Sequence, residues 1–172
     1  MKALTKMLLV ALLVVGLTNV AVAGTTDDKA ITITVGTIAE ISSTGTPTLT
    51  IDATTATGFA AGDSLFTVTD ADSCTYGVTN NSPTSKKITA HLDAAITETL
   101  VKLYITLASA SGVGGTETEI TSVVIAAPAS VVTGLAQEAD SAQVITYKAT
   151  AEVTSPIGAI NKTVTLTLID EA

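Results

Sequence analysis

The sequence has 172 residues with eight lysines, no arginine and sixteen acidic residues, so its formal net charge at pH 7 is −8. Arginine is the side chain best suited to holding phosphate through paired hydrogen bonds, and its absence from an acidic chain argues against nucleic-acid binding. Aromatic residues make up 3% of the chain and tryptophan is missing, which argues against a sugar-binding platform of stacked rings.

The N-terminal region has the pattern of a secretory signal peptide. Two lysines come first, the apolar run Met7–Leu17 follows, and Ala21-Val22-Ala23 gives the small-residue signature of a cleavage site. A membrane anchor is the alternative, but the apolar run is shorter than the roughly 20 residues that a spanning helix needs. We therefore expect cleavage after residue 23 and a secreted, periplasmic or cell-surface protein. Residues 24–172 are expected to form a single domain with no transmembrane segment.

The first predicted strand of the mature chain follows directly. Ile31, Ile33 and Val35 alternate with threonines inside the extended segment Lys29–Ile41, which is the period of a β-strand. One interpretation is an ordinary first strand that pairs within its own sheet. The other is a donor strand, whose apolar row inserts beside an open sheet edge of a neighbouring subunit.

The rest of the chain also alternates with a period of two, which predicts further strands. Threonine forms about a fifth of the chain, and β-branched side chains suit a pleated surface. The predicted strands are 49–51, 65–69, 88–92, 101–107, 120–126, 144–151 and 163–168, separated by turn residues at 43–47, 62–63, 80–83, 109–116 and 156–158. Residues 136–142 suggest a short turn of helix.

This pattern predicts the fold class. Closely spaced strands joined by turns indicate an all-β protein, and we expect an antiparallel immunoglobulin-like β-sandwich. A closed barrel is the alternative. Unequal strand lengths and uneven connections favour the sandwich.

One acidic turn is the best candidate for a cation site. Asp70 and Asp72 lie two residues apart in a predicted loop, and carboxylates at this spacing can share calcium with backbone carbonyls. Asp63 or Asp93 would add an oxygen. The alternative is an ordinary turn, because Asp and Ser are common turn formers. No other cofactor is expected.

The sequence offers no other chemistry. His91 is the only histidine and Cys74 the only cysteine, so no zinc site of the usual nitrogen and sulfur ligands can be assembled. His91 is expected to face solvent on a strand, with a catalytic base of a hydrolase as the alternative. Cys74 is expected to be a buried apolar residue or a thiol available to another chain. Phosphate-loop, dinucleotide and nucleophile-elbow motifs are absent from the sequence. We therefore expect a protein that is not an enzyme.

Four segments resemble a known group of proteins: residues 31–41, 131–135, 145–150 and 162–168. After a signal peptide, this order resembles the small single-domain β-sandwiches of bacterial surfaces. Spore-coat-U-like and pilin-like subunits belong to that group, as do the C-terminal strands of WxL-type wall-binding domains. The resemblance implies a structural or adhesive subunit of a surface fibre, coat or matrix, which associates with itself or with another surface protein. The alternative is a secreted module that binds polysaccharide or calcium.

Overall fold

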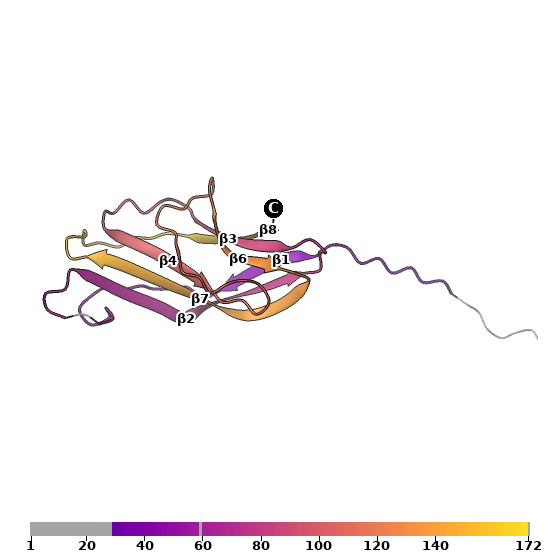
Figure 1. The fold of residues 1–172 in the computed structure, drawn as a ribbon, viewed down its shortest axis with the longest axis horizontal. Coiled ribbons are helices and arrows are strands. Elements are labelled where there is room, and N and C mark those ends of the chain that lie inside the picture. The colour runs from indigo at the N-terminus through magenta and orange to yellow at the C-terminus, as the bar shows by residue number, and fades with distance from the viewer. Residues whose placement is uncertain (1–28, 59, 172) are drawn as a thin grey trace, which may run out of the picture. The chain divides into compact units, whose positions relative to one another are not determined.

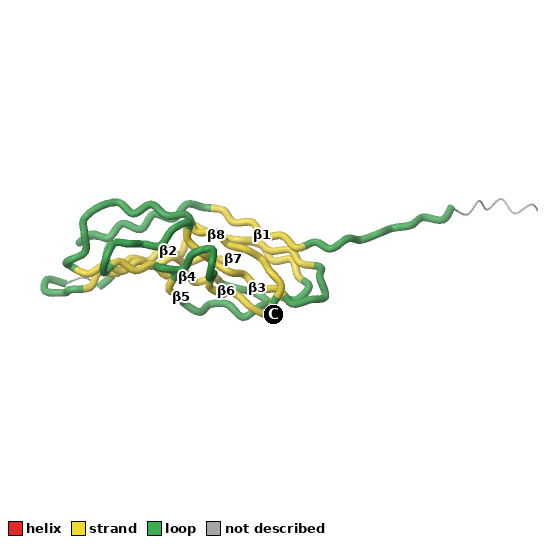
Figure 2. The backbone as a smooth tube through the Cα atoms, turned by 90° about the horizontal axis from the view of Figure 1, so that it is seen from above, coloured by secondary structure: helices red, strands yellow, loops and turns green. Residues whose placement is uncertain are grey.

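The computed structural model describes residues 29–58 and 60–171, so the predicted signal peptide at 1–23 lies outside the described residues. The chain divides into two units, residues 1–35 and 36–172, and each is treated by itself. In the first unit, residues 29–35 form neither helix nor strand. The described part of the second unit contains eight strands and no helix (Figures 1 and 2). The strands are β1 (Ala39–Thr44), β2 (Leu65–Asn80), β3 (Lys86–Leu92), β4 (Val101–Leu107), β5 (Thr118–Glu119), β6 (Ala129–Leu135), β7 (Glu138–Glu152) and β8 (Val164–Asp170).

The strands form two sheets in which all neighbours are antiparallel. The larger sheet has the order β1-β2-β7-β4-β5, and the smaller has the order β6-β3-β8. The two longest strands, β2 and β7, and the shorter β4 lie side by side in Figure 1. The predicted all-β, antiparallel class is therefore confirmed.

One hydrophobic core receives side chains from both sheets. In β2, β3, β4 and β7, alternate residues supply it, since successive side chains of a strand point to opposite faces. The fully buried members include Ile88 and Leu92 of β3, Ile105 and Leu107 of β4, and Val132 of β6. Removing such side chains from water contributes about 1.5–3 kcal/mol each, and this burial holds the two sheets together.

Two long strands depart from regular pairing. The register between β2 and β7 shifts between Asp70 and Cys74 and again between Tyr76 and Val78. Residues 70–73 therefore stay within β2, where a loop was expected. The sequence predicts a strand end because Asp and Ser favour turns, whereas the structure absorbs these residues as an irregularity in a continuing strand.

Three further expectations about elements are wrong. Residues 49–51 form no strand, although Leu49 and Ile51 are half-buried and the residues beside them are exposed. Residues 120–126 form turns around one isolated bridge at Val124. The expected helical turn at 136–142 is wrong as well, because residues 138–142 form the first part of β7 and residues 136–137 link it to β6. In each case the alternation or composition was visible in the sequence, but the pairing partner that decides between strand and turn was not.

The first strand also begins later than predicted. The structure starts β1 at Ala39, so Ile31, Ile33 and Val35 precede it and belong to no strand. Asparagine 81 organises the chain just before β1: its backbone NH donates to the carbonyl of Ile38 (3.0 Å), its side-chain oxygen accepts from the Ile38 amide (2.6 Å), and its side-chain nitrogen donates to the carbonyl of Gly36 (2.8 Å). These three bonds hold residues 36–38 against the end of β2.

Candidate functional site

Strand β8 is an edge strand with backbone groups available for pairing. Its pairing with β3 includes bonds from the Asp93 amide to the Thr163 carbonyl (3.0 Å) and from the Glu171 amide to the Ser85 carbonyl (2.9 Å). In an antiparallel pair, hydrogen-bonding residues alternate along each strand. The NH and C=O groups of the intervening residues therefore point away from β3; these residues are Val164, Leu166, Leu168 and Asp170. No other strand of the described residues pairs with this side of β8, although β1 lies close to β8.

The apolar side chains of β8 are incompletely covered. Val164, Leu166 and Leu168 pack against the core but stay only half-buried, while Thr165 and Thr167 are exposed. Their register partners on β3 are Leu92, Ala90 and Ile88, and each of these is 0% exposed. Burial thus falls sharply from β3 to β8 within one sheet. A strand added beside β8 would cover this row.

The other sheet edges have fewer apolar side chains or fewer free backbone groups than β8. Strand β5 has two residues, and β1 carries a single large apolar side chain, Ile41, among polar ones. The edge of β6 is already used by Val113, whose backbone exchanges two hydrogen bonds with Thr133 (2.7 and 3.1 Å). Within the described part of the chain, β8 is therefore the edge that combines free backbone groups with an apolar row.

The predicted donor segment has the complementary character. Ile31, Ile33 and Val35 are 82%, 83% and 76% exposed. Soluble proteins seldom leave a contiguous apolar row in water unless it has a partner, and such rows mark interaction sites. The structure brings the three residues into no strand, so the interpretation as a strand of their own sheet finds no support in the described residues.

The candidate cation ligands have local roles. Asp70 accepts hydrogen bonds from the Ser73 hydroxyl (2.5 Å) and from the amides of Ser73 (3.2 Å) and Asp72 (3.3 Å). These bonds, above all the one from the Ser73 hydroxyl, lower the pKa of Asp70 despite its partial burial. They stabilise the irregular stretch of β2 by satisfying amides that the shifted register leaves without ladder partners. The Asp72 side chain is exposed.

The two additional aspartates are engaged elsewhere. Asp63 accepts from the Ala60 amide (2.7 Å), and Asp93 from the amides of Ala94 (2.9 Å) and Thr163 (3.1 Å). In the segments 29–58 and 60–171, no three His, Cys, Asp or Glu side chains are grouped so that they could hold a metal ion. The calcium site at Asp70 and Asp72 stays a prediction, and water or backbone oxygens would have to complete it.

His91 and Cys74 also have defined surroundings. His91 is half-buried on β3, opposite Thr165 of β8, rather than fully exposed. Cys74 is 3% exposed and lies 3.6 Å from the Ser73 hydroxyl. Burial of this thiol agrees with its interpretation as a small core residue.

One buried carboxylate outside the β8 edge was missed from sequence. Both carboxylate oxygens of Glu138, the first residue of β7, are shielded from solvent and accept no hydrogen bond within the described residues. Burial, and secondarily the nearby charge of Asp140, raises the pKa of Glu138. Nothing in the sequence distinguishes Glu138 from the exposed acids, because its burial depends on the packing of β7 beside β2.

The outer face of the larger sheet carries an open hollow of about 720 Å³, over β2, β4 and β7. Its one aromatic ring is Tyr104, and the ammonium of Lys148 lies 4.4 Å from the ring centroid. Lys148 also forms an ion pair with Glu117, and Lys102 one with Glu119 (3.4 Å). The lysine covers the ring face on which a sugar would stack, so this hollow gives little support to polysaccharide binding.

Comparisons with known proteins add no assignment: no family model, no curated protein and no solved structure matches this chain. Among the described residues there is no helix with the length and apolar character needed to cross a membrane.

Proposed function

We propose that this protein is an exported, non-enzymatic structural or adhesive subunit of a cell-surface fibre, coat or matrix, assembled by β-strand addition through its N-terminal segment. The observation that carries the proposal is the coexistence, in one chain, of an exposed apolar row at Ile31, Ile33 and Val35 and an unpaired sheet edge at β8 with a half-buried apolar row. Strand addition satisfies both at once, because main-chain bonds supply affinity and alternate side chains supply specificity.

An immunoglobulin-like topology is part of the proposal, and the strand order supports it. In that fold, strands A, B, E and D form one sheet, and C, F and G form the other. Here β1-β2-β7-β4 follow the order A-B-E-D, and β3-β8 follow C-F, whereas β5 beside β4 and β6 beside β3 have no counterpart in that order. Among the described residues no strand lies where G would pair with F, and that place is the open side of β8.

The energetic case rests on burial. Transferring a large aliphatic side chain from water to an apolar site contributes about 1.5–3 kcal/mol, and three such side chains are available in the segment. Ordering the segment opposes this gain by about 1–2 kcal/mol per residue, so the main-chain hydrogen bonds along β8 are needed as well. An uncovered edge strand is otherwise an aggregation hazard, which gives the protein a reason to fill it specifically.

The proposed location follows from residues 1–23, whose pattern is that of a signal peptide. A secreted, periplasmic or cell-surface location places assembly outside the cytoplasm. The partner is a second copy of the chain or another surface protein.

The test compares the mature chain from Gly24 with a chain that begins at Gly36, by size-exclusion chromatography and negative-stain microscopy. We expect oligomers or filaments from the first and a folded monomer from the second, because the truncation removes the donor row and leaves the compact unit 36–172 intact. A mature chain that stays monomeric at every salt and calcium concentration would refute the proposal. It would favour a ligand-binding module, which calorimetry with calcium would then examine.

A further inference from the structure

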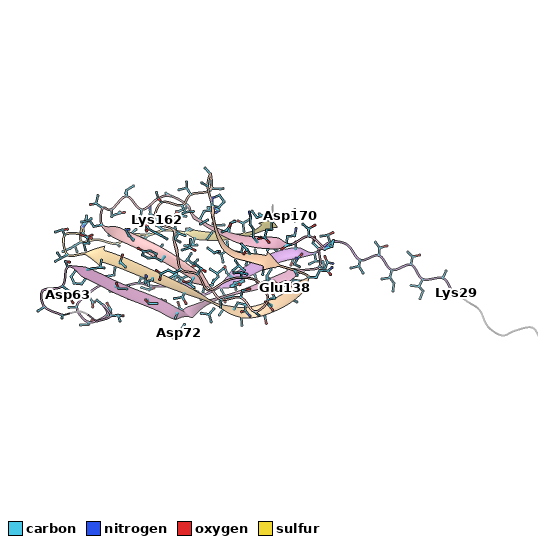
Figure 3. The ribbon with its side chains drawn as sticks, viewed as in Figure 1. Lys29, Asp63, Asp72, Glu138, Lys162 and Asp170 are labelled. Carbon is cyan, nitrogen blue, oxygen red and sulfur yellow. The ribbon has the colours of Figure 1, made fainter. Side chains whose placement is uncertain are left out.

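We propose that Glu138 and Asp140 form a calcium site beside the loop 109–116, at the end of the larger sheet where β7 begins. This site is separate from the acidic stretch at Asp70 and Asp72, and Figure 3 shows Asp72 and Glu138 at different places on the domain. The inference goes beyond the proposed function and does not depend on assembly.

Both carboxylates lie on the core-facing side of the larger sheet. Glu138 is opposite Asn80 and Asp140 is opposite Val78, and Asn80 and Val78 are each 2% exposed. Opposed residues of neighbouring strands share a face, so the two acids, two residues apart in β7, point to the same side as this buried pair. Two like charges held together where water is excluded disfavour each other, so a cation or a proton is needed to compensate them.

The Glu138 carboxylate has no partner among the described residues. Both of its oxygens are buried and accept no hydrogen bond there. Asp140 accepts one long hydrogen bond, from the Ser111 hydroxyl (3.4 Å). Lysines of the described segments form ion pairs with other acids: Glu117, Glu119 and Asp170. Buried charges in native proteins are either paired or bound to a metal ion, and the Glu138 side chain has no pairing group within reach.

Further oxygen atoms surround the two carboxylates. The Tyr76 hydroxyl donates to the carbonyl of Ala108 (2.5 Å) and also hydrogen-bonds the Ser109 side chain. Burial, together with the negative charges of Asp140 and Glu138, raises the pKa of Tyr76 to about 12. The tyrosine hydroxyl therefore lies within electrostatic reach of both acids, and the groups gathered here are carboxylates, hydroxyls and a carbonyl.

This set of oxygen atoms suits calcium. Calcium takes about six to eight oxygen ligands in a flexible geometry, whereas magnesium demands a regular octahedron. The two carboxylates fall short of a group of three acidic or histidine ligands in the described segments. Hydroxyls, backbone carbonyls and water would therefore complete the shell, as they do in many calcium sites.

Protonation is the other way to remove the charge of Glu138. A neutral carboxyl group still has one donor and one acceptor to satisfy, and leaving them unpaired in a buried place is itself costly. A cation between Glu138 and Asp140 engages the carboxylate oxygens and neutralises the charge together, so the geometry favours the cation.

The loop beside the site is anchored to β6. Val113 exchanges two backbone hydrogen bonds with Thr133 (2.7 and 3.1 Å). Gly112 lies so close that a Cβ there would be 2.7 Å from the Thr133 carbonyl oxygen. Ser111, next in the loop, is the residue that contacts Asp140. A cation held by these groups would tie the loop to the start of β7 and stabilise this end of the domain.

The experiment measures the melting temperature of the full mature chain in calcium and in a chelator, at one ionic strength. Extracellular calcium modules bind with dissociation constants of about 0.1–1 mM, so about 10 mM calcium fills such a site. We expect calcium to raise the melting temperature by several degrees. Calorimetry on the same protein should show one site.

Two matched variants locate the site. Glu138→Gln should lose the calcium-dependent rise, whereas Asp72→Asn, at an exposed residue of the acidic stretch, should keep it in full. In the chelator, Glu138→Gln should melt no lower than the unaltered chain, because the amide removes a buried charge. A lost response therefore reports lost binding and not a damaged fold.

Each outcome bears on the proposal. A rise that Glu138→Gln removes and Asp72→Asn keeps supports it. A rise that only Asp72→Asn removes places calcium at the acidic stretch and overturns it, and a rise that both variants keep overturns it in favour of unspecific binding to the acidic surface. No rise and a flat calorimetric trace also overturn it and leave Glu138 a protonated acid. Chromatography of the same samples reports assembly, so the site and the proposed function fail separately.

Discussion

At the residue scale, Glu138 has the only side-chain oxygens among the described residues that are buried without a hydrogen-bond partner, and this burial lowers the stability of the folded state. Its oxygens have neither solvent nor hydrogen-bond partners within the described residues, and an ionised carboxylate in such a place costs more than a neutral one. Folding therefore raises the pKa of Glu138 above its ordinary value of 4.5. A raised carboxyl pKa means that the folded state holds its proton longer than the unfolded state does.

The sign of the pH dependence follows. Below about pH 4 both states are protonated and Glu138 imposes no penalty of charge, but stability falls as the pH rises through the unfolded pKa toward the folded one. We predict that Glu138→Gln raises the melting temperature at pH 7 and leaves it unchanged at pH 3. Glu40→Gln, at an exposed position of β1, is the matched control and should change neither value. An equal gain from Glu138→Gln at both pH values would show that burial of the charge is not the cause.

At the same scale, Gly45 fixes the path of the chain after β1. Its φ is +98°, and a Cβ built there would lie 1.9 Å from the carbonyl oxygen of Ser73 in the irregular stretch of β2. Gly58 also has a positive φ, of +69°, but a Cβ there would meet nothing within 4 Å. A substitution at Gly58 therefore introduces backbone strain alone, whereas one at Gly45 introduces backbone strain and steric overlap.

We predict that Gly58→Ala costs about 1–2 kcal/mol, the strain of a left-handed alanine. Gly45→Ala should cost about 1–3 kcal/mol more, because the overlap forces the backbone of β2 to move. Urea denaturation of both variants measures the difference. Equal losses would mean that the contact between Gly45 and Ser73 is looser than the structure has it.

At the element scale, alternation of apolar and polar residues predicted β4 and β8 correctly, and both of these segments pair with a neighbouring strand over their whole length. The predicted strand 101–107 coincides with β4, and 163–168 nearly coincides with β8. The same alternation at Leu49 and Ile51 yields half-buried side chains without a strand. Side-chain burial follows from local sequence, but ladder hydrogen bonds need a neighbouring strand that only the folded chain supplies.

The open edge could not be predicted for the same reason. Val164, Leu166 and Leu168 look like any inward row, and only the sheet order reveals that one side of β8 has no partner among the described residues. The donor row, in contrast, was visible in sequence as Ile31, Ile33 and Val35. Sequence therefore predicted one half of the candidate interface, and the fold supplied the other half.

The apolar row at Ile31, Ile33 and Val35 gives a prediction at the element scale, and a substitution of the threonine between two of these residues serves as its control. We predict that Ile33→Asp abolishes assembly of the mature chain, because it would place a charge in the core beside β8. Thr34→Asp should still assemble, because its side chain would stay on the outer face. Both changes lie outside the compact unit 36–172, so neither should prevent that unit from folding. Sedimentation velocity on both variants checks this, and equal loss of assembly would argue against an alternating, strand-like interface.

At the scale of the whole molecule, strand addition links assembly to stability. A segment that binds only the folded state stabilises it by an amount that grows with ligand concentration, about 2.7 kcal/mol at a hundred times Kd. The chain from Gly36 carries an open β8 edge and should therefore be less stable than the assembled mature protein. Its stability should recover when the missing strand is supplied in trans.

We predict that a peptide of residues 28–38 raises the melting temperature of the chain from Gly36, in a concentration-dependent manner. A gain of about 2.7 kcal/mol corresponds to several degrees for a domain of this size. The control peptide exchanges Ile31 with Thr32, Ile33 with Thr34 and Val35 with Gly36, which keeps the composition but turns the apolar row to the other face. Only the native order keeps the apolar side chains of residues 31, 33 and 35 on one face, so only the native peptide should stabilise the domain. Stabilisation by both peptides would mean that general apolar contact, and not a registered strand, covers β8.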